Sequence, residues 1–146
     1  MKLEIINKSG YPNPEYKHLG DSGMDIRTCI SSPITLKPLE RSLFPTGIYI
    51  DIPDGYEIQV RSRSGMALKS GVIVLNTPGT IDSGYRNEIG VILINLSSTE
   101  VTINPGDRIA QLVLMKVERV TEFIEVQEFS GNTERNLGGY GSTGMS

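Results

Sequence analysis

The residues best suited to carry chemistry lie between Leu75 and Ile89, in the sequence LNTPGTIDSGYRNEI. Two strand-like arms, one ending at Asn76 and one resuming at Glu88, flank a Pro-Gly turn and a compact loop that carries Asp82 and Tyr85. A carboxylate held on rigid backbone is suited to act as a general base that activates water. Pro-Gly and Asp-Ser-Gly are also typical of ordinary turns, so this stretch alone leaves both interpretations open.

A second group of candidates follows a predicted hairpin. Alternating apolar residues predict one strand from Ile48 to Ile52 and a return strand from Tyr56 to Arg61, joined by a Pro-Asp-Gly turn. The residues after Arg63 predict a short helix that Ser64 caps and Gly71 ends. Free amides, a hydroxyl and guanidinium groups at a helix start favour a phosphate site. A capped connector with solvated arginines is the alternative.

Two further polar residues lie within apolar strand patterns. The stretch from Met24 to Ile30 alternates with period two, which puts Asp25 on the polar face beside Arg27, where an ion pair between them is expected. Gln111 is the single polar residue in the apolar opening of a strand predicted from Ile109 to Val117. A buried amide needs hydrogen-bond partners, so Gln111 is either a structural hydrogen bonder or a ligand contact.

The remaining patterns predict a β-rich domain. Strands are expected at Lys2–Ile6, at Ile89–Leu96 and at Val101–Ile103, and the aliphatic run of the second favours burial on both faces. A chain of 146 residues suffices for one hydrophobic core, and 16 glycines with 8 prolines indicate many turns. We therefore expect one domain over residues 1–120, followed by a C-terminal segment, 121–146, of different composition.

Composition limits the classes of partner. The formal charge of -3 gives the surface no general attraction for nucleic acid or an anionic membrane, so a bound anion requires a local cluster of arginines and amides. One cysteine, Cys29, and one histidine, His18, are too few for a zinc site. The sequence has no signal-peptide pattern and no apolar run long enough to span a bilayer, so a soluble cytoplasmic protein is expected.

The C-terminal segment ends in the glycine-rich sequence ERNLGGYGSTGMS. Such a composition favours disorder. It nevertheless contains a cation, an aromatic ring and two hydroxyls, from Arg135, Tyr140, Ser142 and Thr143. These are the groups that a flexible arm needs in order to close over a nucleotide phosphate.

Taken in order, these stretches resemble the five motifs of the homotrimeric deoxyuridine triphosphatase (dUTPase) family. The five are Ser22–Ile26, Ser62–Gly65, Leu75–Glu88, Gly106–Leu112 and Arg135–Gly144. The resemblance implies an all-β, distorted jelly-roll domain of the β-clip type. It also implies a homotrimer with an exchanged C-terminal arm, in which residues 121–146 form a strand and a flexible arm that closes a neighbouring subunit's active site.

The resemblance implies an activity and a site. The activity is hydrolysis of dUTP to dUMP and pyrophosphate, which limits uracil in DNA and supplies dUMP for dTMP synthesis. Asp82 is implied as the catalytic residue that activates water for attack on the α-phosphorus. Mg²⁺ is the implied cofactor, held mainly by the substrate phosphates and reached by Asp25 through water. The implied substrate-binding residues are Arg63, Ser64, Gly65, Asn76, Gly79, Thr80, Ile81, Tyr85, Gln111, Arg135, Tyr140, Gly141, Ser142 and Thr143.

The sequence departs from the family pattern at four positions. Ser62 stands where proline is common, Asn87 and Asn136 stand where glycine is common, and Tyr140 stands where phenylalanine is usual. These departures concern local geometry, particularly the turn after Arg86.

Two alternatives remain. A dCTP deaminase of the same fold would also bind a pyrimidine deoxynucleotide and Mg²⁺, but such enzymes place a catalytic glutamate in the strand after the hairpin, and Gly90–Ile94 contains no carboxylate. A trimer that binds nucleotide without turnover is the other alternative. A protein without turnover would give no reason for the joint presence of Asp25, Arg63, Asp82 and Gln111.

Overall fold

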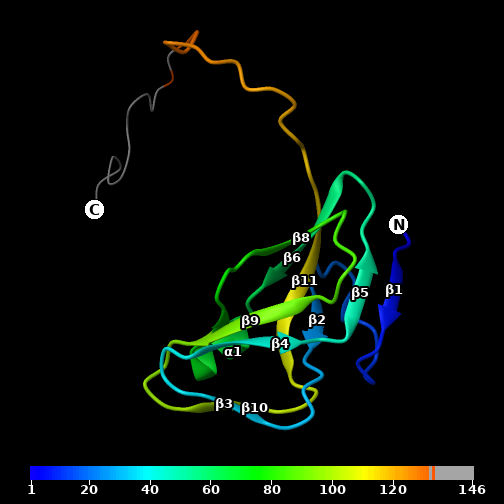
Figure 1. The fold of residues 1–146 in the computed structure, drawn as a ribbon, viewed down its shortest axis with the longest axis vertical. Helices are drawn as coiled ribbons and strands as arrows, with labels where there is room; N and C mark the ends of the chain where they lie inside the picture. The colour runs from blue at the N-terminus through cyan, green and yellow to red at the C-terminus, as the bar shows by residue number, and fades with distance from the viewer. Residues whose placement is uncertain (132, 134–146) are drawn as a thin grey trace.

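The computed structural model describes residues 1–131 and residue 133, and in this part of the chain nearly all regular structure is β (Figure 1). The single helix of the described residues is too short to cross a membrane. The elements are β1 (Glu4–Asn7), β2 (Met24–Arg27), β3 (Ile34–Leu36), β4 (Arg41–Pro45), β5 (Ile48–Asp51), β6 (Tyr56–Arg61), α1 (Ser64–Ser70), β7 (Val72–Val74), β8 (Gly79–Asp82), β9 (Gly90–Asn95), β10 (Val101–Ile103) and β11 (Arg108–Lys116).

The strands of the described residues form four antiparallel sheets. The largest has the order β2-β11-β6-β8, a second has the order β4-β9-β7, and β1-β5 and β10-β3 are two-stranded. Every pairing joins strands that are not consecutive in the sequence. Such long crossover connections are typical of a jelly roll, and they confirm the predicted all-β fold class.

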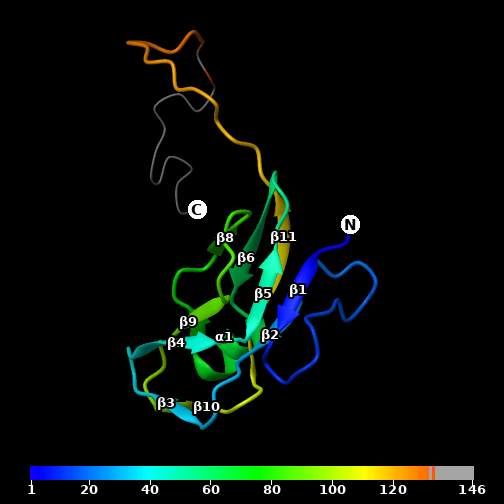
Figure 2. The same ribbon diagram turned by 45° about the vertical axis from the view of Figure 1, so that its right-hand side comes forward.

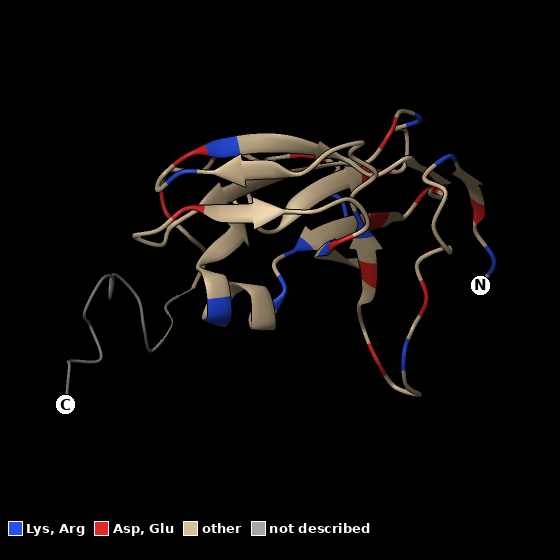
Figure 3. Cartoon of the chain, turned by 90° about the horizontal axis from the view of Figure 1, so that it is seen from below, with Lys and Arg blue, Asp and Glu red and all other residues tan. Residues whose placement is uncertain are grey.

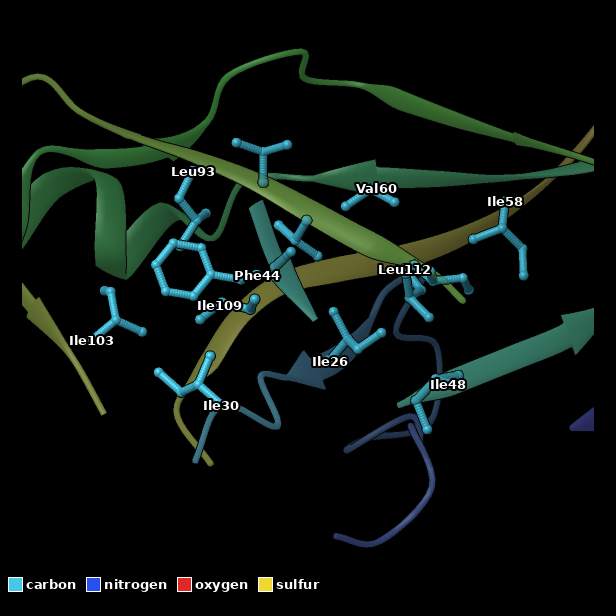
Figure 4. Close-up of a cluster of buried hydrophobic side chains, with 14 of the residues drawn as sticks. Ile26, Ile30, Phe44, Ile48, Ile58, Val60, Leu93, Ile103, Ile109 and Leu112 are labelled. Atoms are coloured by element: carbon cyan, nitrogen blue, oxygen red, sulfur yellow. The ribbon is translucent and has the colours of Figure 1, made fainter. Parts of the chain in front are cut away.

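The hydrophobic core lies between the two larger sheets. Side chains from both sheets point toward one another there, among them Ile26, Phe44, Ile58, Leu93 and Leu112 (Figure 4). Each of these five is essentially inaccessible to solvent. The period-two patterns therefore predicted correctly which faces of β2 and β6 are buried.

The predicted hairpin of residues 48–61 is wrong. The turn itself exists, because the Tyr56 amide donates to the Pro53 carbonyl over 3.2 Å. However, β5 pairs with β1, whereas β6 pairs with β11 and β8 in a different sheet (Figure 2). Alternation along a strand determines which face is buried and contains no information about the partner strand.

Burial of β9 on both faces is also wrong. Val91, Leu93 and Asn95 are buried, whereas Ile92 and Ile94 on the other face are only half-buried. The sheet β4-β9-β7 has the core on one side only in the single chain. Its outward side therefore presents an apolar surface, to which Leu43 of β4, opposite Ile92, also contributes.

The residues after β11 leave the body of the domain. Figures 1 and 2 both show this segment extending away from the sheets. No helix or strand occurs in residues 117–131. The predicted C-terminal strand and arm of residues 121–146 remain a prediction, because most of the arm lies outside the described residues.

Gly47 provides a test of this fold. Its φ of 66° lies in the left-handed region, and a Cβ there would lie 2.6 Å from the Ser9 amide nitrogen. Gly55 has a similar φ of 79° with open space around it. We expect Gly55→Ala to lower the free energy of unfolding by about 1–2 kcal/mol, and Gly47→Ala by at least about 3 kcal/mol because a backbone clash is added.

Urea unfolding of both variants at one protein concentration measures this difference. Equal losses would contradict the close approach of the loop after β1 to the turn before β5.

Candidate functional site

Asp25 is the centre of a polar cluster on the outward face of the largest sheet. Arg63 donates from Nε to Asp25 Oδ1 over 3.0 Å, and Arg108 donates from Nη1 to Asp25 Oδ2 over 3.2 Å. Gln111, directly opposite Asp25 in the register of β2 and β11, donates from Nε2 to Oδ1 over 3.4 Å. The structure thus brings together Asp25, Arg63 and Gln111.

The predicted ion pair between Asp25 and Arg27 is not formed. Arg27 donates from Nη1 to the carbonyl of Gly106 over 2.6 Å, and Asp25 binds Arg63 and Arg108. Spacing along one strand did not reveal the arginines that other elements supply. Arg108 was missed as a site residue, although its place at the start of a strand that contains Gln111 was a usable signal.

The helix begins one residue earlier than predicted. Its N-cap is Arg63, with no side-chain cap hydrogen bond, so Ser64 is the first helical residue and not the cap. Gly71 ends the helix in the left-handed conformation, as predicted.

Beside α1 lies an open hollow of about 550 Å³. Four cationic side chains and one carboxylate line it, which favours an anion: Arg27, Arg63, Lys69, Arg108 and Asp107. Figure 3 shows basic positions in blue on the helix and beside it.

Asp82 is the last residue of β8, at an edge of the same sheet, and its side chain is exposed. The prediction of a loop position for Asp82 is therefore wrong, because residues 79–82 pair with β6 despite their turn-like composition. Tyr85 follows in a turn in which its amide donates to the Asp82 carbonyl over 3.0 Å. Its hydroxyl donates to the Glu88 carbonyl over 2.9 Å, and 41% of the residue remains exposed.

The loop after β8 is anchored through two residues of its second half. Arg86 forms an ion pair of 2.6 Å with Asp51 of β5. The Glu88 carboxylate accepts hydrogen bonds from the amides of Thr46 and Gly47 over 2.9 and 2.7 Å. These contacts fix the backbone on which Asp82 and Tyr85 are carried.

Gly79 permits a close approach in the turn before β8. A Cβ at Gly79 would lie 3.0 Å from Nδ2 of Asn76, and the Thr77–Pro78 peptide bond between them is cis. Thr80 is exposed and Ile81 is half-buried. The structure thus brings together Asn76, Gly79, Thr80 and Ile81 beside Asp82.

The sequence patterns did not predict a contact that Arg119 makes near Asp82. Arg119 donates to Oδ1 of Asp54 over 2.5 Å and to Oγ of Ser83 over 3.3 Å. The hydrogen bond from Arg119, together with its charge, holds the pKa of Asp54 below its usual range. Arg119, just before the C-terminal segment, is thus connected to the turn between β5 and β6 and to the turn that follows Asp82.

The two groups of site residues lie apart within one chain. β2, which carries Asp25, and β8, which carries Asp82, are the opposite edges of the four-stranded sheet. Three inter-strand spacings separate them by about 14 Å across the sheet, and their positions along the strands also differ. The other predicted residues, Arg135, Tyr140, Gly141, Ser142 and Thr143, lie outside the described residues.

Fold and site define an all-β protein with an arginine-rich hollow and a separate exposed carboxylate. A model of the dUTPase family matches residues 10–144. A deoxyuridine 5'-triphosphate nucleotidohydrolase of Finegoldia magna is 56% identical over 144 residues, which cover 99% of this chain and 99% of that relative. The chain therefore belongs to the dUTPase family.

Solved structures agree. A dUTPase of Staphylococcus bacteriophage 80alpha with dUPNHPP superposes with a TM-score of 0.86 at 27% identity, covering 98% of each chain. A mutant dUTPase of phage phi11 of S. aureus, described with a structural Mg(II) ion, superposes with a TM-score of 0.78 at 25% identity, covering 90% of this chain and all of that one.

The titration of Cys29 tests the position of Glu88, which anchors the loop after β8. Burial raises the pKa of the Cys29 thiol above its usual range, and the negative charge of Glu88 raises it further. We therefore expect Cys29 to form thiolate at higher pH than a free cysteine does. Glu88→Gln keeps an acceptor for the two amides but removes the charge, so it should lower the pKa of Cys29 part of the way.

The ultraviolet absorbance of the thiolate, followed as a function of pH, measures both effects. An unchanged titration curve in Glu88→Gln would mean that Glu88 does not lie near the thiol.

Proposed function

We propose that this protein hydrolyses dUTP to dUMP and pyrophosphate, with Asp82 as the general base. The observation that carries this proposal is the exposed carboxylate of Asp82 on a strand whose following loop is anchored by Arg86 and Glu88. A fixed carboxylate can hold a water molecule and accept its proton as the water attacks the α-phosphorus. The reaction would limit uracil in DNA and supply dUMP for dTMP synthesis.

The phosphate chain of the substrate would bind at the Asp25 cluster. Arg63 and Gln111, with the backbone and hydroxyl of Ser64 and the backbone of Gly65, supply donors there, and the adjacent cationic hollow favours the negative charge. These donors would stabilise charge that moves onto the departing pyrophosphate.

Asp25 suits a water-mediated role toward Mg²⁺. Its side chain is 25% exposed, but both oxygens also bind arginines. Among the described residues no group of three or more His, Cys, Asp or Glu side chains could hold a metal ion. A small hard cation that retains its water would therefore take most of its other direct ligands from the substrate phosphates. Bound Mg²⁺ would stabilise the negative charge on the departing pyrophosphate.

The base and sugar would bind at the turn before β8. Asn76, Gly79, Thr80 and Ile81 offer close backbone approach and hydrogen-bonding groups for uracil. Tyr85, whose hydroxyl is held by the Glu88 carbonyl, would stack under the deoxyribose and leave no room for a 2′-hydroxyl.

A homotrimer with an exchanged arm would join the two groups of site residues. The separation of Asp25 and Asp82 across the sheet supports a site shared between subunits. Exposed apolar residues after β11, with Phe123 at 89% and Phe129 at 92%, support docking of this segment on another chain. An open groove beside β1 and β5, lined by Glu4, Ile6 and Tyr49, is a suitable receptor. Residues 1–120 would then be the domain and 121–146 the strand and arm.

Product analysis tests the proposed reaction. Purified protein with Mg²⁺ is given dUTP, dCTP, dTTP or UTP separately, and pyrophosphate, nucleoside monophosphate and ammonia are assayed. We expect dUMP and pyrophosphate from dUTP alone. Ammonia from dCTP would assign the chain to the deaminases, and no product from any nucleotide would leave a binding protein.

Asp82→Asn is the control within this experiment. We expect the variant to fold and to bind dUTP while its single-turnover rate falls by about 10²–10⁴-fold, the range for loss of a general base. Retained turnover would remove Asp82 from the proposed role.

Truncation after Asn132 tests the arm. We expect the truncated protein to keep its unfolding midpoint and oligomeric state, because the core ends at β11 and the exposed Phe123–Phe129 segment is retained. Hydrolysis of dUTP should collapse, because the proposed contacts of Arg135, Tyr140, Ser142 and Thr143 are lost. Sedimentation and activity assays measure both, and full activity would exclude a role for the arm.

A further inference from the structure

A row of polar side chains runs along the outward face of β6. Arg61 donates from Nε and Nη2 to Oε1 of Gln59, over 3.0 and 2.7 Å. Gln59 in turn donates from Nε2 to Oε1 of Glu57 over 2.7 Å. All three residues are half-buried. The row therefore runs continuously from the cation at one end to a carboxylate at the other.

Glu57 ends this row directly opposite Asp82. The register of β6 and β8 pairs Glu57 with Asp82 and Gln59 with Thr80, so all four side chains share the outward face. Directly opposed side chains in an antiparallel pair have Cβ atoms about 4.5–5.5 Å apart, and like charges there repel. Two residues with carboxylate side chains are thus directly opposed at the position of the proposed general base.

No arginine, lysine or histidine of the described residues forms an ion pair with Glu57. Its compensation within this part of the chain is the Gln59 amide. That amide is oriented by Arg61, because a guanidinium can only donate and so pairs with the amide oxygen, which accepts. The amide nitrogen is then left facing Glu57.

Arg61 is itself held in place. Its Nη2 also approaches Sδ of Met115 at 3.7 Å, and the register of β6 and β11 puts Arg61 opposite Gln111. The guanidinium is thus fixed from β11 while it fixes the amide on β6.

We propose that Arg61 is a positioning residue for Asp82. Arg61 orients the Gln59 amide, and the amide holds the Glu57 carboxylate along β6 and away from Asp82. The proposal rests on the proposed function of Asp82. Without Arg61 the amide is free to reverse, Glu57 loses its donor, and its charge repels the carboxylate that must hold the attacking water.

The test compares Arg61→Met, Glu57→Gln and the double variant in single-turnover hydrolysis of dUTP. We expect Arg61→Met to slow the chemical step about two- to five-fold, the scale of one opposed like-charge pair, with little change in KM. Glu57→Gln should keep at least the wild-type rate, and adding it to Arg61→Met should restore that rate. A structural role of Arg61 would not be rescued by a change at Glu57.

Lys116→Met is the matched control, since it removes one cation from the same sheet at an exposed position. It should leave the rate unchanged. Gln59→Leu interrupts the row at its middle and should reproduce the Arg61→Met defect, which provides a second route if Arg61→Met fails to fold. An unchanged rate in both, or a defect that Glu57→Gln does not relieve, would overturn the proposal.

Stability separates this inference from the proposed function. If the two carboxylates repel, Asp82→Asn should recover part of any unfolding free energy lost in Arg61→Met, whether or not the protein hydrolyses dUTP. Retained turnover in Asp82→Asn would refute the catalytic role alone. Absence of the stability coupling, in an enzyme that Asp82→Asn inactivates, would refute the positioning role alone.

Discussion

The register of β11 is the constraint on which the rest of the site depends. β11 is hydrogen-bonded to β2 on one side and β6 on the other, and this double pairing aligns Asp25, Gln111 and Arg61 in one row across the sheet. A slip of one residue would turn Gln111 into the core and Leu112 out to solvent, because side chains alternate between faces. The cost of exposing Leu112 and burying an unpaired amide fixes the register, and so the polar cluster is maintained by the hydrophobic core beneath it.

The same sheet explains why the two groups of site residues do not meet in one chain. Its inner strands, β11 and β6, are paired on both sides, whereas β2 and β8 form its edges. Asp25 and Asp82 are both outward-facing residues of edge strands, where side chains and backbone remain accessible to another molecule. The anchors of the loop after β8, from Arg86 to Asp51 and from Glu88 to two backbone amides, are then needed because an edge strand alone would not hold Asp82 in place.

Local patterns in the sequence predicted faces and ends but not partners. Alternation correctly indicated the buried faces of β2 and β6, and Gly71 correctly marked the end of α1, because both effects act within a few residues. The hairpin of residues 48–61 failed since all strand pairings in this fold join distant segments. For the same reason the ion-pair partners of Asp25 were not found from spacing. Strands as short as β3, β4 and β8 contain too few residues for a periodic pattern to be recognised.

The positions of Asp25 and Asp82 at opposite edges of the sheet also bear on the proposed assembly. If Asp25 of one chain is to meet Asp82 of another, the β2 edge of the first must approach the β8 edge of the second, so the two contacting surfaces are different. Identical chains that use one such head-to-tail contact form a ring when the rotation closes and a filament when it does not. A closed trimer pairs every Asp25 with an Asp82 of another chain, whereas a filament leaves one Asp25 and one Asp82 unpaired at its ends. If the proposed site joins Asp25 of one chain to Asp82 of another, their positions at opposite edges of the sheet therefore favour a cyclic assembly over an open one.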